Sequence, residues 1–433
     1  MTEVQKIVYE GLMGFYESHK GGPFLGSQLV EYMEPIFKRA GLREETAVSG
    51  QHILVVRDDA AGDFVLFSPF MRELRRIYPG AHITLFASDR NAELARCCPY
   101  IDNILIKNFE RDSGSFWEIY PMLARHAVEQ FVPYHFDLAF AGRLGLKSAS
   151  VLLMYMGGAK RRVTYTQNRP KADGTMVDVG WDDLISIPVP ILNKLESDVD
   201  RDLYILEYIL QLPIADRHLE LWTLASDREA ARQAVEPLLG KKNIKRLYTV
   251  MPCTSEAFRQ WPVERFIEML KVIMKREKDL GLVLMGGKGD APRTETVAKA
   301  FPGRALSLAG KLPFRVSAEV VGLTEKYIGD DTALMHIAAA KKVPVLTTFP
   351  YPAELGLRPM SVPIRFQPYQ VPSVILLPPK AAGDKCRLSH GTGCSVAAGP
   401  HCILGITVEK MLDGYKRLNK CIEEGRTASL VLK

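Results

Sequence analysis

The hydrophobic and polar positions of this chain predict two regions in which short apolar strands alternate with helices. In the first region, apolar runs of four to five residues are separated by segments with helical periodicity. The strand candidates are 53–56, 82–86, 103–106 and 136–140, and the helix candidates are a pattern ending at Leu74, 91–96, 116–131 and 147–156. Such alternation is typical of βαβ units and a parallel sheet.

The same alternation returns in the second half of the chain. The strand candidates are 247–251, 281–285, 305–308, 326–328 and 343–348, and the helix candidates are 262–276, 292–300, 317–323 and 333–340. Between the two regions, residues 166–197 are rich in Pro and Gly and have little periodicity, which indicates a linker or an active-site loop. Two α/β domains joined in this way make a cleft, the usual place for a ligand.

The two ends of the chain have a different pattern. Residues 1–41 predict one or two amphipathic helices interrupted at 21–23, followed by a polar linker, and residues 407–424 predict a last amphipathic helix. We therefore expect a helical N-terminal extension at 1–50, α/β domains at 51–215 and 216–406, and a C-terminal helical segment at 407–433.

Composition narrows the class of protein. The 433 residues carry 56 Lys and Arg against 50 Asp and Glu, and 47% of them are hydrophobic, which excludes a disordered or fibrous chain. No apolar run reaches the roughly 18 residues that span a bilayer, and the N-terminus lacks a signal-peptide pattern. Seven cysteines in such a chain indicate reduced thiols in a cytoplasm, and a net charge of +6 does not point to nucleic acid.

The first candidate for chemistry follows the first predicted strand. Asp58, Asp59 and Asp63 lie within six residues, and Gly62 allows a close backbone approach. Ligands of open α/β sheets bind at the carboxyl ends of strands, beside the following helix. Asp63 is therefore a candidate catalytic acid or base, and the competing interpretation is a simple helix cap.

Two further candidates follow strands of the second region. Thr254 and Ser255, with Arg259 nearby, offer hydroxyls and a positive charge that suit a diphosphate. Gly286 and Gly287 allow a ligand to approach the backbone, and an acid just beyond them suits ribose hydroxyls. The competing interpretations are a polar loop and a plain tight turn.

A fourth candidate opens the helix at 333–340. Asp331 and Thr332 are placed to cap this helix, and His336 lies one turn beyond Thr332 on the same face. A histidine in an apolar helix is usually a packed residue. Its position beside an Asp-Thr cap at the mouth of a cleft favours a functional role.

Other chemistries are disfavoured or left open. No G-x-G-x-x-G follows a strand and no Walker A pattern is present, which disfavours a dinucleotide oxidoreductase and a P-loop ATPase. Cys386, Cys394 and Cys402 are each separated by seven residues, with His390 and His401 nearby. This spacing is not a usual zinc pattern, so we expect structural or free thiols, with metal binding as the alternative.

Taken in order, these motifs resemble those of glycosyltransferase family 9, the ADP-heptose:lipopolysaccharide heptosyltransferases. The resemblance runs from about residue 52 to residue 418. The matching residues are Gly62-Asp63 with Pro69 and Leu74, 134–138, Arg259-x-Trp261-Pro262, Gly286-Gly287 with Asp290, 308–311, 329–332 with His336, and Val343-Pro344.

The resemblance implies an α/β protein with a GT-B fold, in which two Rossmann-like domains face a cleft. Residues 51–215 would bind the acceptor, residues 216–406 would bind the nucleotide-sugar, and the final helix would pack back on the first domain. The family transfers sugar with inversion, without a bound metal and without a cofactor beyond its ADP-sugar donor.

The resemblance also assigns roles by position. Asp63 would be the general base, and Arg259 the basic residue at the diphosphate. The remaining donor-binding residues would be Thr254, Ser255, Gly286, Gly287, Asp290 at the ribose, Leu312 at the base, Asp331, Thr332 and His336. Two positions depart from the family pattern, because Ala333 replaces a glycine and Arg259 stands where many members have lysine.

The implied partners are a nucleotide-sugar donor and an anionic glycolipid acceptor at the inner membrane surface, and no nucleic acid. Basic clusters at 72–76 and 160–162 could meet such an acceptor, or could be solvated helix faces. We expect a cytoplasmic enzyme at or near that membrane face. The alternatives are the same fold acting on a protein or another glycan, and a nucleotide-sugar- or metal-binding protein without turnover.

Overall fold

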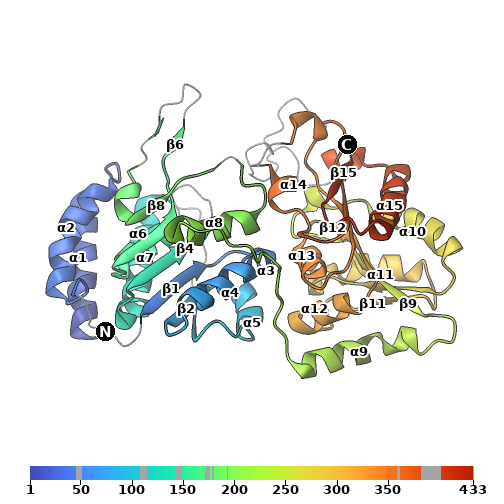
Figure 1. The fold of residues 1–433 in the computed structure, drawn as a ribbon, viewed down its shortest axis with the longest axis horizontal. Coiled ribbons are helices and arrows are strands. Elements are labelled where there is room, and N and C mark those ends of the chain that lie inside the picture. The colour runs from blue at the N-terminus through green and yellow to red at the C-terminus, as the bar shows by residue number, and fades with distance from the viewer. Residues whose placement is uncertain are drawn as a thin grey trace. The chain divides into compact units, whose positions relative to one another are not determined.

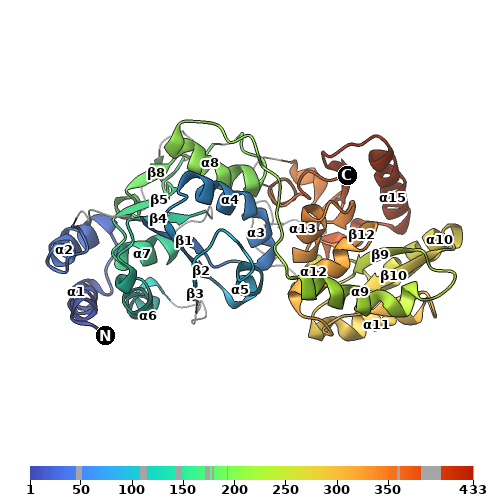
Figure 2. The same cartoon turned by 60° about the horizontal axis from the view of Figure 1, so that its bottom comes forward.

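The computed structural model describes residues 1–44, 51–107, 115–142, 149–170, 176–177, 180–192, 194–357, 361–381 and 401–432 (Figures 1 and 2). The chain forms two compact units. Unit 1 comprises Met1–Asp59, Phe70–Leu192 and Arg201–Ala215, and unit 2 comprises Ala60–Pro69, Asn193–Asp200 and Asp216–Lys433. Two short segments from the first half of the chain therefore belong to unit 2 by their contacts.

Unit 1 is built on a six-stranded parallel sheet with the strand order β3-β2-β1-β4-β5-β8. Its strands are β1 (His52–Arg57), β2 (His82–Ala87), β3 (Asn103–Ile106), β4 (Leu138–Ala141), β5 (Arg161–Tyr165) and β8 (Ile187–Val189). The first four strands were expected, and the near-continuous burial of β1, β2 and β4 is typical of a parallel sheet covered on both faces.

The helices of unit 1 cover both faces of this sheet. They are α1 (Glu3–His19), α2 (Gly26–Arg39), α4 (Ser68–Ile77), α5 (Asp89–Ala95), α6 (Phe116–Gln130), α7 (Ala149–Met156) and α8 (Asp198–Leu210), with the short helices η1 (Val132–Tyr134) and η2 (Asp182–Leu184). The first residues of α4 (68–69) and of α8 (198–200) belong to unit 2. Successive strand residues point to opposite faces: Leu54 belongs to the core that contains α1, α2, α6 and α7, whereas Phe140 contacts Phe70 of α4. The N-terminal helical extension is thus part of the unit 1 core, and α1 packs directly on α6 (Figure 1).

The Pro-rich stretch 166–197 contains more regular structure than we expected. It holds a two-stranded hairpin of β6 (Arg169–Pro170) and β7 (Met176–Val177), then η2 and strand β8. Pro188 lies in the middle of β8, opposite Thr164 of β5. A proline is tolerated there because β8 is the edge strand of the sheet and needs no hydrogen bonds on its outer side.

Unit 2 contains a seven-stranded parallel sheet with the order β11-β10-β9-β12-β13-β14-β15. The strands are β9 (Arg246–Met251), β10 (Leu280–Leu284), β11 (Ala305–Ser307), β12 (Lys326–Asp330), β13 (Val345–Thr348), β14 (Ser373–Leu376) and β15 (Leu430–Leu432). Five of these strands were expected, and the last two extend the sheet at one edge.

The helices of unit 2 are α3 (Ala61–Leu66), α9 (Ala225–Leu239), α10 (Val263–Arg276), α11 (Ala291–Lys299), α12 (Phe314–Gly322), α13 (Ala333–Ala340), α14 (Val362–Arg365) and α15 (Val408–Glu423). Short helices η3 (Ala257–Arg259), η4 (Lys288–Asp290), η5 (Ala353–Leu355) and η7 (Cys402–Gly405) lie in the loops. Among the helices that the structure describes, none has the length and apolar content needed to cross a membrane.

The C-terminal helix α15 packs on the sheet of unit 2, and its expected packing on the first domain stays a prediction. Met411 and Leu418 belong to the same buried core as Val374 and Leu376 of β14. The cause is the strand that follows the helix: β15 pairs in parallel with β14, and a parallel pair of strands needs a crossover connection. Helix α15 lies in that connection, so it covers the sheet that its own strand completes.

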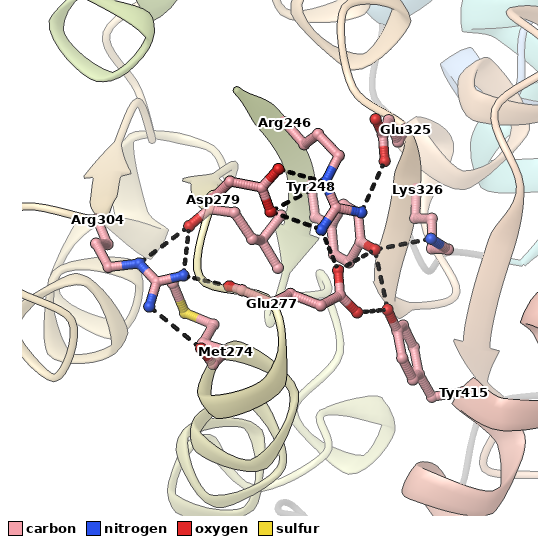
Figure 3. A network of polar contacts seen from close by, with 10 residues as sticks. Arg246, Tyr248, Met274, Glu277, Asp279, Arg304, Glu325, Lys326 and Tyr415 are labelled. Atoms are coloured by element: carbon pink, nitrogen blue, oxygen red, sulfur yellow. Dashed lines mark hydrogen bonds and ion pairs between the residues drawn. The ribbon is translucent and has the colours of Figure 1, made fainter. Parts of the chain in front are cut away.

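A polar network ties α15 to the amino-terminal end of this sheet (Figure 3). The Tyr415 hydroxyl donates to Glu277, and the Tyr248 hydroxyl donates to the other oxygen of Glu277 at 2.8 Å. Nζ of Lys326 donates to the Tyr248 hydroxyl at 2.7 Å, and Arg246 donates to Glu277 at 3.0 Å. Burial lowers the pKa of Lys326 and raises the pKa of Tyr415 to about 12, so the tyrosine stays uncharged at neutral pH.

Candidate functional site

The predicted donor motifs follow neighbouring strands of unit 2. Thr254 lies in the loop after β9, Asp290 in the loop after β10, and Asp331 directly after β12. Strands β10, β9 and β12 are adjacent and parallel, so their carboxyl ends share one edge of the sheet. This edge is where ligands of open α/β sheets bind.

The loop after β9, residues 252–261, is ordered by its own side chains. The Thr254 hydroxyl donates to the carbonyl oxygen of Glu256 at 2.8 Å and accepts from the Glu256 N–H at 3.1 Å. Nε2 of Gln260 donates to the carbonyl oxygen of Thr254 at 2.9 Å. Thr254 is buried and Ser255 is exposed, so the first residue shapes the loop and the second offers its hydroxyl to the surroundings.

Arg259, at the end of η3, joins the second and fourth motifs. Its Nη2 donates to the carbonyl oxygen of Asp331 at 3.0 Å and also to the Asp331 carboxylate. The Arg259 side chain is 27% exposed, while the Asp331 side chain is nearly buried. The acid therefore holds the guanidinium in place at the edge of the sheet, with part of it open to a ligand.

Asp330, the last residue of β12, is a buried acid to which the sequence assigned no role. Its carboxylate accepts from the Thr348 hydroxyl at 2.7 Å and from the Trp261 N–H at 3.2 Å. Burial raises the pKa of Asp330 to about 7 despite these hydrogen bonds. The only signal in the sequence is an acid that ends a buried strand pattern.

The turn after β10 is closed by its acid. The Gly287 N–H donates to Asp290 at 2.8 Å, and a Cβ atom on Gly286 would lie 2.7 Å from Cβ of Asp290. Asp290 therefore caps the turn that leads into α11. Its contact to a ribose stays a prediction, as does the role of the half-buried Leu312.

Helix α3 packs against the start of α13, which brings Asp63 to this part of unit 2. A Cβ atom on Gly62 would lie 2.8 Å from Cδ2 of His336 and 3.1 Å from Cα of Ala333, so only glycine allows this approach. The Asp63 carboxylate also accepts from the Ala60 N–H at 3.1 Å. Asp63 therefore caps helix α3 and also lies near the start of α13, where the fourth predicted motif is located.

His336 is buried beside several carboxylates. Burial lowers its pKa below 6.5, although the nearby negative charges of Asp331, Asp63 and Asp198 act to raise it. Its Nδ1 has no hydrogen-bond partner among the residues that the structure describes. The ring is therefore neutral at pH 7 and keeps one nitrogen for a further hydrogen bond.

Arg365 and Asp198 form a second charged pair near this histidine. Nε and Nη2 of Arg365 donate to the two oxygens of Asp198 at 2.8 and 2.9 Å. The Arg365 guanidinium lies over the Phe366 ring, and that ring makes an edge contact with the His336 ring. Sequence reasoning missed this pair, because no local pattern links residues so far apart in the chain.

Comparison with known proteins decides the family. The family model described as glycosyltransferase family 9 (heptosyltransferase) matches residues 134–366, which is more than half of the chain. The chain belongs to glycosyltransferase family 9. The matched residues include Thr254, Arg259 and Asp331, whereas Asp63 lies before them.

Relatives of this family 9 glycosyltransferase are distant in sequence. Lipopolysaccharide heptosyltransferase 3 of Escherichia coli is 23% identical over 290 residues, which are 66% of this chain and 79% of that protein. A family 9 glycosyl transferase from Veillonella parvula has a TM-score of 0.63 at 18% identity, covering 85% of this chain and 97% of that one. E. coli ADP-heptose lipopolysaccharide heptosyltransferase II has a TM-score of 0.60 at 15% identity, covering 86% and 100%. These structures share the GT-B fold with this chain.

The first basic cluster of this glycosyltransferase is held by internal contacts. Arg75 donates to the carbonyl oxygen of Ala81 at 2.6 Å and to Asp102 at 2.5 Å, while Arg72 and Arg76 both pair with Glu73. These side chains therefore stabilise unit 1, and Arg76 alone in this cluster is largely exposed, at 64%.

The second basic cluster is not a helix face. Arg161 and Arg162 begin strand β5, and the buried Arg162 donates to the carbonyl oxygens of Leu184 and Ala159, both at 2.6 Å. Lys160 pairs with Asp137. Both interpretations of this cluster, an acceptor patch and a solvated helix face, are wrong for Arg162, because its guanidinium satisfies backbone carbonyls inside unit 1.

The cysteines that the structure describes form no disulfide with one another. Cys402 lies beside His401, and burial raises the pKa of the Cys253 thiol. Cys386, Cys394 and His390 lie outside the described residues. Within the described ranges, no group of three or more His, Cys, Asp and Glu side chains could hold a metal ion.

Proposed function

We propose that this glycosyltransferase transfers a heptose from ADP-heptose to a sugar of the lipopolysaccharide inner core, with inversion and without a bound metal. One observation carries the proposal: helix α3, with Asp63, packs on the start of α13 in unit 2, beside His336 and the Asp331–Arg259 pair. A candidate base and candidate groups for the diphosphate therefore belong to one unit. The family and the names of the relatives support heptose as the sugar.

Arg259 and the start of α13 would stabilise the departing ADP. Both contacts of Arg259 to Asp331 use Nη2, so the pair orients the guanidinium without engaging its other donors. Backbone N–H groups at a helix N-terminus favour anions, and the Ser255 hydroxyl is exposed beside them. Fixed donors of this kind stabilise developing negative charge in the transition state.

Asp63 would act as the general base. As the acceptor oxygen forms its bond to the anomeric carbon, its proton passes to the Asp63 carboxylate. The bond between the anomeric carbon and the diphosphate oxygen breaks, and ADP leaves with the electron pair. Attack on the face opposite the leaving group inverts the anomeric configuration, and general-base help is typically worth about 10²–10⁴ in rate.

His336 would hydrogen-bond the donor sugar. Its ring is neutral at pH 7 because burial lowers the pKa, and Nδ1 has no partner in the described part of the chain. A neutral imidazole can donate to or accept from a sugar hydroxyl. The packing of α3 on α13 supports both the base role of Asp63 and the sugar contact of His336.

The donor is tested first by thermal unfolding with ADP, ADP-heptose, UDP-sugars and GDP-sugars. A ligand at 100 times its Kd adds about 2.7 kcal/mol to the stability of the folded state, and a tighter ligand at the same concentration adds more. We therefore expect ADP-heptose, as the proposed donor, to raise the melting temperature most. A larger shift with a UDP- or GDP-sugar would contradict the assigned donor.

The acceptor is tested by offering labelled ADP-heptose with a lipopolysaccharide core lipid, a soluble core oligosaccharide and a protein acceptor, each with and without EDTA. We expect label in the core lipid, unaffected by EDTA and with the inverted anomer by NMR. Label only in protein would support the alternative acceptor. ADP-heptose binding with no transfer to any acceptor would contradict an active enzyme.

A further inference from the structure

We propose that Arg293 and Asp330 are positioning residues for the donor: together they hold Trp261 and thereby fix the loop that carries Thr254 and Arg259. The link to the donor rests on the proposed function, whereas the effect on the loop can be measured without any substrate. Arg293 lies outside the motifs that the sequence placed at the donor, and Asp330 lies inside the motif at 329–332 but was given no role there.

Arg293 closes the base of the loop. Its Nε donates to the carbonyl oxygen of Pro252 at 2.5 Å, and its Nη2 donates to the carbonyl oxygen of Trp261. Pro252 and Trp261 are the two ends of the loop, so one guanidinium spans both. Its planar, fixed donor geometry suits this task, which a lysine ammonium on a flexible stem cannot reproduce.

Asp330 holds the same tryptophan from strand β12. Its carboxylate accepts from the Trp261 N–H, while Arg293 binds the Trp261 carbonyl. The indole is fully buried, and its Nε1 donates to the carbonyl oxygen of Ile406 at 2.8 Å. Trp261 is thus held at its N–H, its carbonyl and its ring.

These contacts set the position of Arg259 relative to β12. Asp330 binds the Trp261 N–H, and the next residue, Asp331, binds Arg259 two positions earlier in the loop. Two consecutive acids therefore fix two nearby points of the loop. If Asp330 or Arg293 no longer bonds to Trp261, the position of the Arg259 guanidinium is no longer fixed. The affinity for the donor should then fall.

Arg304 provides a matched control at the other end of the sheet. Its guanidinium also donates to backbone carbonyls, those of Glu277 at 2.5 Å, Leu280 at 2.9 Å and Met274 at 3.2 Å (Figure 3). Arg293 and Arg304 thus make the same kind of contact in the same unit. Only Arg293 makes it to the loop after β9.

The experiment compares Arg293→Gln, Arg293→Lys, Asp330→Val, Asp330→Asn and Arg304→Gln in the full chain. Amide hydrogen exchange of residues 252–261 is measured without ligand, and ADP binding, donor KM and kcat are measured separately. Arg293→Gln and Asp330→Val should each speed exchange in this loop and weaken ADP binding by about tenfold or more, because each leaves buried polar groups unpaired. Acceptor KM should stay unchanged.

Two variants separate positioning from a merely structural role. Asp330→Asn keeps an oxygen for the Trp261 N–H and can donate its amide to Thr348, so it should retain donor KM within about twofold. Arg304→Gln should lower the melting temperature while loop exchange and donor KM stay at the wild-type values. Arg293→Lys should resemble Arg293→Gln, because lysine cannot span both carbonyls.

The inference is wrong if Arg293→Gln leaves exchange in 252–261 unchanged, or if Arg304→Gln raises donor KM as much as Arg293→Gln does. Failure of the proposed function gives a different result: the wild-type chain would bind no nucleotide-sugar. In that case the exchange of the ligand-free loop still decides whether Arg293 and Asp330 hold it.

Discussion

The two ends of the unit 2 sheet both carry charged residues, but they use them differently. At the amino-terminal end, Lys326, Tyr248, Glu277 and Tyr415 bond to one another, and the lysine also lies over the Tyr248 ring (Figure 3). At the carboxyl-terminal end, the Asp331–Arg259 pair is part-exposed, and Nδ1 of His336 has no partner among the described residues. A polar network whose groups all bond to one another stabilises the fold. A network in which some hydrogen-bonding groups are exposed or unpartnered can also bind a ligand.

Each end also contains a buried ionisable group with a shifted pKa. Burial lowers the pKa of Lys326 and raises the pKa of Asp330 to about 7. The shift brings the pKa of Asp330 into the neutral range, where the charge of this group depends on pH. The comparison therefore predicts that changes at the carboxyl end affect the reaction and its pH dependence, and that changes at the amino end affect stability alone.

The largest expected effect is that of Asp63→Asn. The amide cannot accept the proton of the acceptor hydroxyl, so kcat should fall by about 10²–10⁴, while ADP binding by calorimetry should be unchanged. Asp58→Asn is the control for loss of charge in the same segment, because Asp58 pairs with Lys107. Turnover close to that of the wild type in Asp63→Asn would exclude Asp63 as the base.

Gly62→Ala should have the next largest effect. The new methyl group would lie 2.8 Å from His336 and 3.1 Å from the Ala333 backbone, so α3 must move away from α13. We expect a loss of about 1–3 kcal/mol in the free energy of unfolding and a fall in kcat of at least about tenfold. Gly80→Ala is the control, because a Cβ atom there meets nothing within 4 Å. Unchanged activity in Gly62→Ala would show that this packing does not position Asp63.

Asp330→Asn should change how stability depends on pH. The pKa of Asp330 is raised from 3.8 to about 7, so the folded chain holds a proton that the unfolded chain has lost. Stability from this group therefore falls as pH rises between about 4 and 7, and Asp330→Asn should gain about 3 kcal/mol relative to wild type across this window. Chemical unfolding at several pH values measures the difference.

Asp279→Asn is the control for this pH dependence. Hydrogen bonding to Arg246 lowers the pKa of Asp279, so its contribution to stability is lost as pH falls, the opposite direction. A difference between Asp330→Asn and wild type that stays constant with pH would contradict the assigned titration of Asp330.

Tyr415→Phe should have the smallest effect. The variant loses the hydrogen bonds of the hydroxyl to Glu277 and Tyr248 but keeps the ring, so unfolding should become easier by about 0.5–1.5 kcal/mol. Donor KM should not change. A raised donor KM would show that the two ends of the sheet are not independent, and that the comparison fails.

Much of the fold could be predicted from the sequence, because long buried strands appear as apolar runs. Strands β5 and β8 were missed because they lack this signal. Strand β5 begins with two arginines, and the buried Arg162 donates to the backbone carbonyls of Ala159 and of the distant Leu184. Strand β8 contains a proline. Strand β14 was missed although Val374–Leu376 is a buried apolar run, and β15 is a three-residue strand at the edge beside it. Helix α15 was predicted, but an amphipathic face does not reveal which surface it covers.

The sequence predicted which motifs form the candidate site, but it did not predict which of their residues contact one another. Asp331 and Arg259 were both expected at the donor, yet their pairing joins residues far apart in the chain. Arg293 was missed because it donates to backbone carbonyls. Every residue has such a carbonyl, so the amino-acid sequence does not indicate which of them an arginine contacts. Asp330 was missed because its partners are a main-chain N–H and a threonine of another strand.

The packing of α3 on α13 has a consequence for how the chain is made. Residues 61–66 leave the ribosome roughly 270 residues before residue 333, which at about 5–20 residues per second is tens of seconds of synthesis. During that time the segment with Asp63 has no α13 to pack against. The acid proposed to start the reaction is therefore among the first residues synthesised and among the last to reach its working position.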